Sequence, residues 1–300
     1  MPKQGEVPPP GIPPPEIEIT IDLARHLVSS QHADLAGMDL RFFGSGWDNT
    51  TFRLGDDLAV RIPRRQLGAE MMVKEHRWLG ELAPRLPLPI GAPVRRGAPD
   101  AEYPWLWSVV PWYKGVSAER EDMSPEETDK LAGFLAALHH DPPQDSPTSE
   151  YRGGPLTSRA DSVERRIDRL SDDDVGVALD RVREIWRGAK EVPIDVDPSW
   201  LHGDLHPRNL IVNAGQLVAV IDWGDICVGD RATDLAAAWM LFPNDVQDRF
   251  RAAYGPISPA TWERARGWAI LFGVVLVDAG LQDDPQWAAA GARTLRRACS

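Results

Sequence analysis

The sequence has little cysteine and no excess of positive charge. Its 300 residues contain two cysteines, Cys227 and Cys299, which are too few for a disulfide framework or a cysteine metal cluster. That usage suits a reducing cytosol. The formal net charge of −12 provides no basic face for nucleic acid. We therefore expect a cytoplasmic protein that binds no nucleic acid, with an acidic surface that either attracts a cationic substrate or only promotes solubility.

Long apolar runs are also missing. The N-terminal stretch MPKQGEVPPPGIPPPE lacks the apolar core of a secretory signal. The longest apolar run, residues 268–277, is too short to span a bilayer and predicts a buried helix. Neither secretion nor membrane insertion is expected. Hydrophobic residues nevertheless make up 43% of the chain, enough to form the core of one large domain or of two lobes.

The stretch that organises the chain is WLHGDLHPRNLIVNAGQLVAVIDWGD, residues 200–225. Two short apolar runs, 210–212 and 217–221, are separated by turn residues and predict a strand hairpin. Asp204 and Asn209 precede the first strand and Asp222 follows the second, so the three side chains can converge. Oxygen ligands suit Mg²⁺, which proteins usually hold with one or two carboxylates plus substrate phosphates. We therefore predict that Asn209 and Asp222 hold Mg²⁺ and that Asp204 accepts a proton from an attacking hydroxyl.

The runs HGDLHPRN, residues 202–209, and IDWG, residues 221–224, resemble the catalytic and metal-binding segments of the aminoglycoside phosphotransferase family of antibiotic kinases. Protein kinases, which are related to that family, have HRDxxxxN and DFG in these places. Gly203 replaces the arginine and Trp223 replaces the phenylalanine, and both differences favour a small-molecule kinase. The resemblance implies a bilobal, protein-kinase-like α+β fold, with a small antiparallel-sheet N-lobe and a larger, mainly helical C-lobe. His202 is expected to be structural, and His206 has no assigned role.

Three segments are expected along the chain. Residues 1–15, rich in proline and glycine, predict a flexible leader. Residues 16–111 would form the nucleotide-binding lobe. Residues 112–300 would form the catalytic and substrate-binding lobe, beginning where PWYKG breaks an apolar strand over 103–110. At this hinge, backbone groups of Val109 and Val110 are candidates for reading a purine edge.

Apolar alternation over residues 40–46, 49–55 and 57–63 predicts three strands of the first lobe. The glycine-rich turn between the first two strands allows close approach to phosphate. In the family that the sequence resembles, this hairpin covers the nucleotide. The resemblance therefore implies that Ser45, Gly46 and Asn49 contact ATP or GTP.

The third strand carries Arg61 in the place of the phosphate-binding lysine of kinases, and a guanidinium can bind phosphate oxygens bidentately. A helical pattern over residues 66–82 contains the acid expected to hold Arg61 toward the phosphates. Glu75 matches the family's helix glutamate best, and Glu70 is the alternative.

Acceptor-binding residues are harder to predict. Residues 158–187 carry alternating charge with apolar spacing, which predicts a helical pair. Asp225, close to the metal-binding motif, is the candidate for binding a substrate ammonium. Asp230 suits a helix N-cap, and Asp234 suits support of the catalytic loop.

The main hypothesis is transfer of the terminal phosphate of ATP or GTP to a hydroxyl of a small cationic molecule, an aminoglycoside antibiotic. Alternatives are a macrolide phosphotransferase and a metabolic kinase for a choline-like, amino-alcohol or sugar acceptor. A nucleotide-binding pseudokinase scaffold would be expected to lack one of Asp204, Asn209 and Asp222, yet all are present. Asp225 favours an aminoglycoside and the twelve tryptophans favour a macrolide, so the sequence leaves the acceptor and the oligomeric state open.

Overall fold

The computed structural model describes residues 13–300, and these divide into two compact units. The first contains the described residues up to Pro84, together with Pro89–Lys114 and Ile221–Gly224. The second contains Arg85–Leu88, Gly115–Val220 and Asp225–Ser300. Most of the predicted proline-rich leader, residues 1–12, lies outside the described part of the chain.

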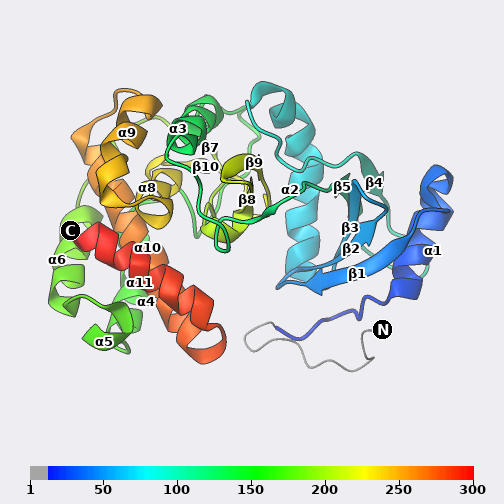
Figure 1. Cartoon of the computed structure of the whole chain (residues 1–300), viewed down its shortest axis with the longest axis horizontal. Coiled ribbons are helices and arrows are strands. Elements are labelled where there is room, and N and C mark those ends of the chain that lie inside the picture. The colour runs from blue at the N-terminus through cyan, green and yellow to red at the C-terminus, as the bar shows by residue number, and fades with distance from the viewer. Residues whose placement is uncertain (1–12) are drawn as a thin grey trace. The chain divides into compact units, whose positions relative to one another are not determined.

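An antiparallel sheet forms the centre of the first unit (Figure 1). Its strand order is β1-β2-β3-β5-β4. The strands are β1 (Leu40–Ser45), β2 (Asn49–Leu54), β3 (Leu58–Pro63), β4 (Arg95–Gly97) and β5 (Trp107–Pro111). The first three lie within a residue of their predicted positions. β5 starts later than the predicted residue 103, since Pro104 has no backbone N–H for a ladder bond.

Two helices cover opposite faces of this sheet, α1 (Ile21–Gln31) and α2 (Gln66–Leu82), as Figure 1 shows. Successive side chains on a strand point to opposite faces. Val60 therefore joins the core that contains Leu27 of α1, whereas Arg61 points to α2. Short 3₁₀ turns follow the two helices at Ala33–Leu35 and Ala83–Arg85. The sheet thus presents Arg61 on the face covered by α2.

The second unit is mainly helical. Its α-helices are α3 (Glu127–Leu138), α4 (Ala160–Ile167), α5 (Asp172–Val175), α6 (Leu179–Lys190), α7 (Ala232–Leu235), α8 (Ala237–Leu241), α9 (Asn244–Tyr254), α10 (Pro259–Asp283) and α11 (Pro285–Cys299), with 3₁₀ turns η3 (Leu156–Arg159) and η4 (Pro207–Asn209). The predicted pair over 158–187 is instead three helices, because Ser171 opens α5 with a capping box and Gly176 ends it in a left-handed conformation.

The predicted hairpin is present in the second unit. It consists of β8 (Leu210–Asn213) and β9 (Gln216–Val220), and β6 (Val116–Ser117) pairs with β8. A separate antiparallel pair joins β7 (Ser199–Leu201) to β10 (Cys227–Gly229). The α+β class, with a small antiparallel sheet in one unit and a mainly helical second unit, is confirmed.

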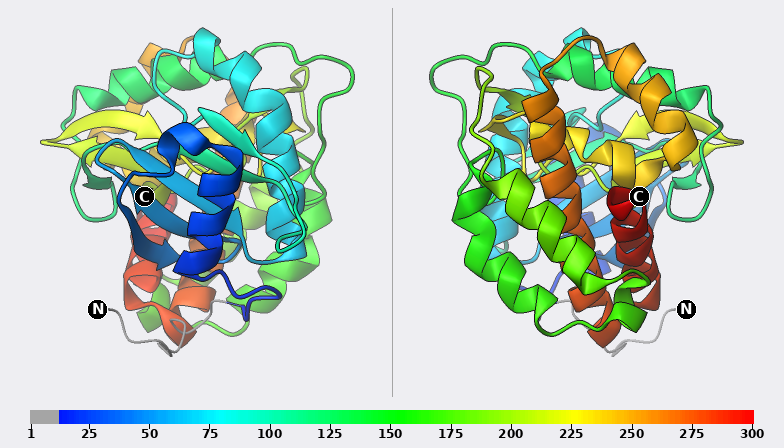
Figure 2. Two further views of the ribbon diagram at one scale, coloured as in Figure 1. Left: turned by 90° about the vertical axis from the view of Figure 1, so that its right-hand side faces the viewer. Right: turned by 90° about the vertical axis from the view of Figure 1, so that its left-hand side faces the viewer.

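Helix α10 is the long core helix of the second unit. Its 25 residues extend well beyond the predicted apolar run, since Ser258 caps the helix and Pro259 occupies its first turn. By length and composition alone the stretch Pro259–Gln282 could cross a membrane, yet 72% of its apolar window is buried inside the protein. Figure 2 shows α10, in orange, beside α6 and α11, which it contacts.

Candidate active site

The catalytic loop between β7 and β8 has its backbone fixed by Asp234 of α7. The Asp234 carboxylate accepts the His202 N–H at 2.7 Å and the Gly203 N–H at 2.9 Å, and it is fully buried beside His139. Gly203 adopts a φ of +85°, and a Cβ there would lie 2.7 Å from the Asp225 carbonyl oxygen. Only glycine fits this turn. Asp234 therefore supports the catalytic loop, as predicted.

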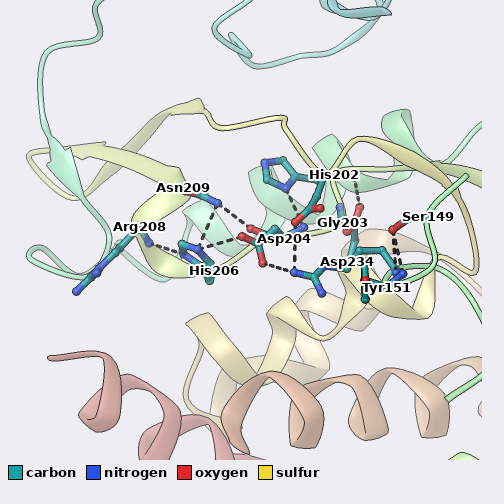
Figure 3. Close-up of polar contacts among 11 residues, drawn as sticks. Ser149, Tyr151, His202, Gly203, Asp204, His206, Arg208, Asn209 and Asp234 are labelled. Carbon is teal, nitrogen blue, oxygen red and sulfur yellow. Dashed lines mark hydrogen bonds and ion pairs between the residues drawn. The ribbon is translucent and has the colours of Figure 1, made fainter. Parts of the chain in front are cut away.

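Both carboxylate oxygens of Asp204 have partners (Figure 3). Arg152 Nη2 lies 3.1 Å from Oδ1, and His206 Nε2 lies 3.3 Å from Oδ2. Burial acts to raise the pKa of Asp204, but His206 and Arg152 outweigh burial and hold that pKa far below its usual range. The carboxylate is thus ionised and can accept a hydrogen bond from an approaching hydroxyl.

Asn209 closes the loop from its other end. Its Nδ2 donates to the backbone carbonyl of Asp204 at 2.9 Å, and its side chain lies close to His206. Within the described residues its Oδ1 accepts no hydrogen bond, which leaves that oxygen available to a cation. Residues 13–300 contain no cluster of three or more His, Cys, Asp or Glu suited to a metal. A metal here would need oxygens from elsewhere, as Mg²⁺ bound to nucleotide phosphates has.

In the first unit, Arg61 forms a buried ion pair. Arg61 Nη1 lies 2.7 Å from Glu75 Oε2, and the Glu75 side chain is only 1% exposed. Glu70 instead accepts a hydrogen bond from Gln66. Burial acts to lower the pKa of Arg61, but the carboxylates of Glu75 and Asp222 outweigh it and raise that pKa. Of the two acids considered from the sequence, Glu75 is the partner of Arg61.

Asp222 directly follows the hairpin in sequence and belongs to the first unit. Its backbone is left-handed, with a φ of +63°, which is unusual for a residue other than glycine. The carboxylate is 57% exposed and its Oδ1 lies 3.3 Å from Arg61 Nη2. An exposed carboxylate oxygen is suited to a hydrated divalent cation.

Some of the polar groups in the β1–β2 hairpin form hydrogen bonds within the hairpin itself. Ser45 Oγ lies 3.0 Å from Thr50 Oγ1, and the Gly46 N–H donates to the Asn49 carbonyl at 2.9 Å. Asn49 Oδ1, by contrast, is buried without a hydrogen-bond partner in the described structure. Because an unsatisfied buried acceptor is costly, Asn49 Oδ1 is suited to accept a hydrogen bond from a further donor.

The expected hinge strand, β5, is buried in the sheet. The Val109 carbonyl accepts the Val94 N–H at 2.8 Å, so it is already occupied. The β4 ladder ends at Val109, opposite Arg95, and leaves Val110 beyond it. Val110 is paired with Ala59 of β3, so its backbone groups point to the other side of the strand.

Asp225 has a partner that the sequence did not reveal. Arg152, in the loop between α3 and η3, lies 3.3 Å from Asp225 Oδ2 through the same Nη2 atom that contacts Asp204. No motif marks Arg152, because it lies 52 residues before Asp204. His206 was likewise given no role, although it contacts the Asp204 carboxylate.

Residues 39–268 match the model of the phosphotransferase enzyme family. The chain belongs to that family. Aminoglycoside 3'-phosphotransferases of Escherichia coli and Salmonella typhimurium are each 30% identical to this phosphotransferase over 189 residues, 61% of the chain and 68% of the relative. The family predicted from residues 202–224 is therefore confirmed, and with it the assignment as an enzyme.

Solved structures agree with the predicted fold. The GDP complex of an aminoglycoside 2'-phosphotransferase superposes with a TM-score of 0.71 at 17% identity, covering 94% of this phosphotransferase and 99% of that chain. A macrolide 2'-phosphotransferase of Brachybacterium faecium gives 0.60 at 22% identity, covering 91% and 97%. At these identities the likeness establishes the fold, which is the one expected from the sequence.

Proposed function

We propose that this phosphotransferase moves the terminal phosphate of ATP or GTP to a hydroxyl of a small cationic antibiotic, with an aminoglycoside as the main candidate. The observation that carries the proposal is the Asp204 carboxylate, which lies beside Arg152 and His206 on a loop fixed by Asp234. Two relatives named aminoglycoside 3'-phosphotransferase, and neighbouring structures solved with kanamycin or gentamicin, support the acceptor class. Neighbours solved with GDP or ADP support a nucleotide donor.

The nucleotide would bind in the lobe formed by residues 16–111. Arg61, held by Glu75, would neutralise phosphate charge, since phosphoryl transfer depends mainly on positioning and charge neutralisation. Ser45, Gly46 and Asn49 are assigned to phosphate contacts at the hairpin turn, with the unpartnered Oδ1 of Asn49 as support.

The base would be read at the end of β5, where Val109 and Val110 are the candidate residues. Residues 112–300 would form the catalytic and acceptor-binding lobe, with Asp225 as a ligand for an acceptor ammonium. We assign the enzyme to the cytoplasm, where its nucleotide donor is available.

Asn209 and Asp222 are assigned to Mg²⁺ on the spacing of their motifs along the chain and on their oxygen donors. When bound, Mg²⁺ supplies neutralisation of phosphate charge. Asp204 orients the acceptor hydroxyl and takes its proton. Asp234 keeps the loop backbone in place through both of its carboxylate oxygens.

A macrolide, which also carries an amine, is the second candidate. Aromatic surface lies beside the catalytic loop of the second unit, where the Trp287 ring is 6.1 Å from His206 and 4.7 Å from the Arg208 guanidinium. Such a surface suits a large apolar acceptor. A metabolic amino alcohol or sugar, and a scaffold that binds nucleotide without transfer, are further outcomes of the screen below.

The test is a phosphotransfer screen with ATP and GTP against aminoglycosides, macrolides, choline-like amino alcohols and sugars, read by mass spectrometry as one added phosphate. Asp204→Asn should lower turnover by about 10³-fold, because general-base contributions are typically of that order, and should leave nucleotide affinity nearly unchanged. Asp248→Asn, at an exposed position of α9, is the control. Unchanged turnover in Asp204→Asn would refute the assignment.

A further inference from the structure

Arg152 occupies the space between the two acidic side chains that the proposed function needs. Its Nη2 lies 3.1 Å from Asp204 Oδ1 and 3.3 Å from Asp225 Oδ2. The guanidinium carbon lies 5.3 Å from the centre of the Phe272 ring on α10. A cation is therefore already present where an acceptor ammonium is expected to bind.

The backbone of Arg152 is firmly anchored. Ser149 Oγ accepts the N–H groups of Tyr151 and Arg152 at 3.1 and 3.2 Å, a turn that is visible in Figure 3. At Gly153, the N–H donates to Thr233 Oγ1 and the carbonyl accepts the Asp230 N–H at 2.8 Å. Since the main chain is fixed, the guanidinium can leave the two carboxylates only by rotation of its own side chain.

The side chain itself is held weakly. Charge-assisted N–H···O bonds are usually about 2.7–2.9 Å long, and both bonds from Arg152 are longer. Only Nη2 takes part, and Nε is buried without a partner among the described residues. Arg264 in the same unit shows the alternative, because two of its nitrogens bond Asp230, one of them at 2.6 Å. Arg152 thus lacks the bidentate geometry of a permanent buried pair.

Arg152 can leave only if another cation takes its place. Departure of Arg152 alone would leave the carboxylates of Asp204 and Asp225 without the cation that they share, and two like charges close together repel each other. At the same time, Asp204 Oδ1 contacts Arg152 and Oδ2 contacts His206. A hydroxyl that bonds Asp204 Oδ1 must therefore share that oxygen with Arg152 for as long as Arg152 stays in place.

We propose that Arg152 is an internal substitute for the cationic group of the acceptor. An acceptor ammonium replaces the guanidinium at Asp225, and this exchange frees Asp204 Oδ1 for the acceptor hydroxyl. Arg152 is then a specificity-determining residue. It restricts productive binding to hydroxyl compounds that carry an ammonium close enough to reach the same carboxylate pair, and it excludes neutral sugars. The inference rests on the proposed function, because it takes Asp204 as the group that receives the hydroxyl.

The direct test is equilibrium binding without nucleotide. Arg152→Gln removes the competing cation, so an aminoglycoside should bind about tenfold more tightly by calorimetry, a change typical of one charged hydrogen bond. The fully N-acetylated aminoglycoside, which has the same hydroxyls and no ammonium, should gain nothing. Arg165→Gln removes one charge from an exposed arginine of α4 and should leave the aminoglycoside Kd unchanged.

A second probe is independent of acceptor identity. Arg152→Ala should bind methylguanidinium, and this ion should weaken aminoglycoside binding to the variant without affecting the wild-type protein. Arg152→Lys keeps a cation at this position. Its Kd for the aminoglycoside should remain within about threefold of the wild-type value, a smaller change than the loss of one charged hydrogen bond would cause.

Unchanged or weaker aminoglycoside binding in Arg152→Gln would overturn the exchange, as would a fall in kcat at constant acceptor KM, which indicates fixed positioning of Asp204. If Arg152→Gln does not fold, the methylguanidinium measurement on Arg152→Ala and the Arg152→Lys comparison decide. A failure of the proposed function can be distinguished from a failure of the Arg152 exchange. If the wild-type protein transfers phosphate to no acceptor, the proposed function is refuted, whereas the binding measurements still test the exchange.

Discussion

Two arginines of this phosphotransferase meet carboxylates in contrasting ways. In the first unit, Arg61 forms a 2.7 Å bond to Glu75, whose side chain is 1% exposed. In the second, Arg152 makes bonds of 3.1 and 3.3 Å to Asp204 and Asp225, which are 28% and 26% exposed. The first arginine has a short bond to a buried partner, and the second shares one nitrogen between two accessible partners. The difference agrees with the two proposed roles: Arg61 would have to stay in place to bind phosphate, whereas Arg152 would have to leave when an acceptor ammonium binds.

Local structure explains the difference. Glu75 lies in the middle of α2, where the helix fixes the position of its Cα and the sheet fixes Arg61 opposite it. Arg152 comes from a loop, and its guanidinium reaches the carboxylates along a side chain with several rotatable bonds. In the Arg61–Glu75 pair, regular secondary structure therefore fixes the backbone of both residues. In the contacts of Arg152, the backbone is fixed but the guanidinium can move by rotation of the side chain.

The largest expected effect comes from breaking the rigid pair. Glu75→Gln removes the buried charge partner of Arg61 and leaves only the exposed Asp222 carboxylate beside it. Breaking a buried pair typically costs about 3 kcal/mol of stability. Arg61 would no longer be held in the phosphate-binding position, so kcat/KM for the nucleotide should fall about 100-fold, or about 2.7 kcal/mol of transition-state binding. Steady-state kinetics with ATP and GTP, together with urea unfolding, measure both.

Glu70→Gln is the matched control, since Glu70 lies on the same helix and accepts a hydrogen bond only from Gln66 among the described residues. It should change both quantities little. Equal losses in the two variants would mean that α2 as a whole, and not the Arg61–Glu75 pair, is being tested. Wild-type kinetics in Glu75→Gln would remove Arg61 from the phosphate site.

A smaller effect is expected at the exchangeable pair. Asp225→Asn removes one of the two carboxylates that an ammonium would bind, so KM for a cationic acceptor should rise about tenfold while KM for the nucleotide stays constant. The double variant Asp225→Asn/Arg152→Gln should not show the tighter aminoglycoside binding expected of Arg152→Gln alone. The reason is that Asp225 and Arg152 would act through their contact with each other. Additive effects would show that Asp225 and Arg152 act separately.

The site residues that can be proposed from the sequence are those that belong to short motifs or to a regular helix. Asp204, Asn209 and Asp222 belong to runs with characteristic spacing, and Glu75 lies one helix away from the strand that carries Arg61. Arg152 was not predictable, because loop residues far apart in sequence meet only through tertiary packing. For the same reason the sequence indicates only an acceptor ammonium as the partner of Asp225, although this carboxylate also contacts Arg152 of the protein itself. The occupied Val109 carbonyl depends on pairing with β4, a strand of three residues with no clear pattern.

The smallest expected effect concerns the protonation of His76, a buried histidine of α2. His76 follows Glu75, is buried, and bonds Ser108 Oγ at 2.7 Å. Burial, with a further contribution from Arg96, lowers the pKa of His76 from 6.5 to about 4. As the pH falls below 6.5, the unfolded chain binds a proton at His76 that the folded chain does not bind, so the free energy of unfolding should decrease by about 0.8 kcal/mol between pH 7.5 and 6. Urea unfolding of wild type and His76→Gln measures this difference, which should be absent in the variant. A parallel pH dependence in both proteins would show that His76 binds its proton equally well in the folded and unfolded states, and that burial beside Ser108 does not lower its pKa.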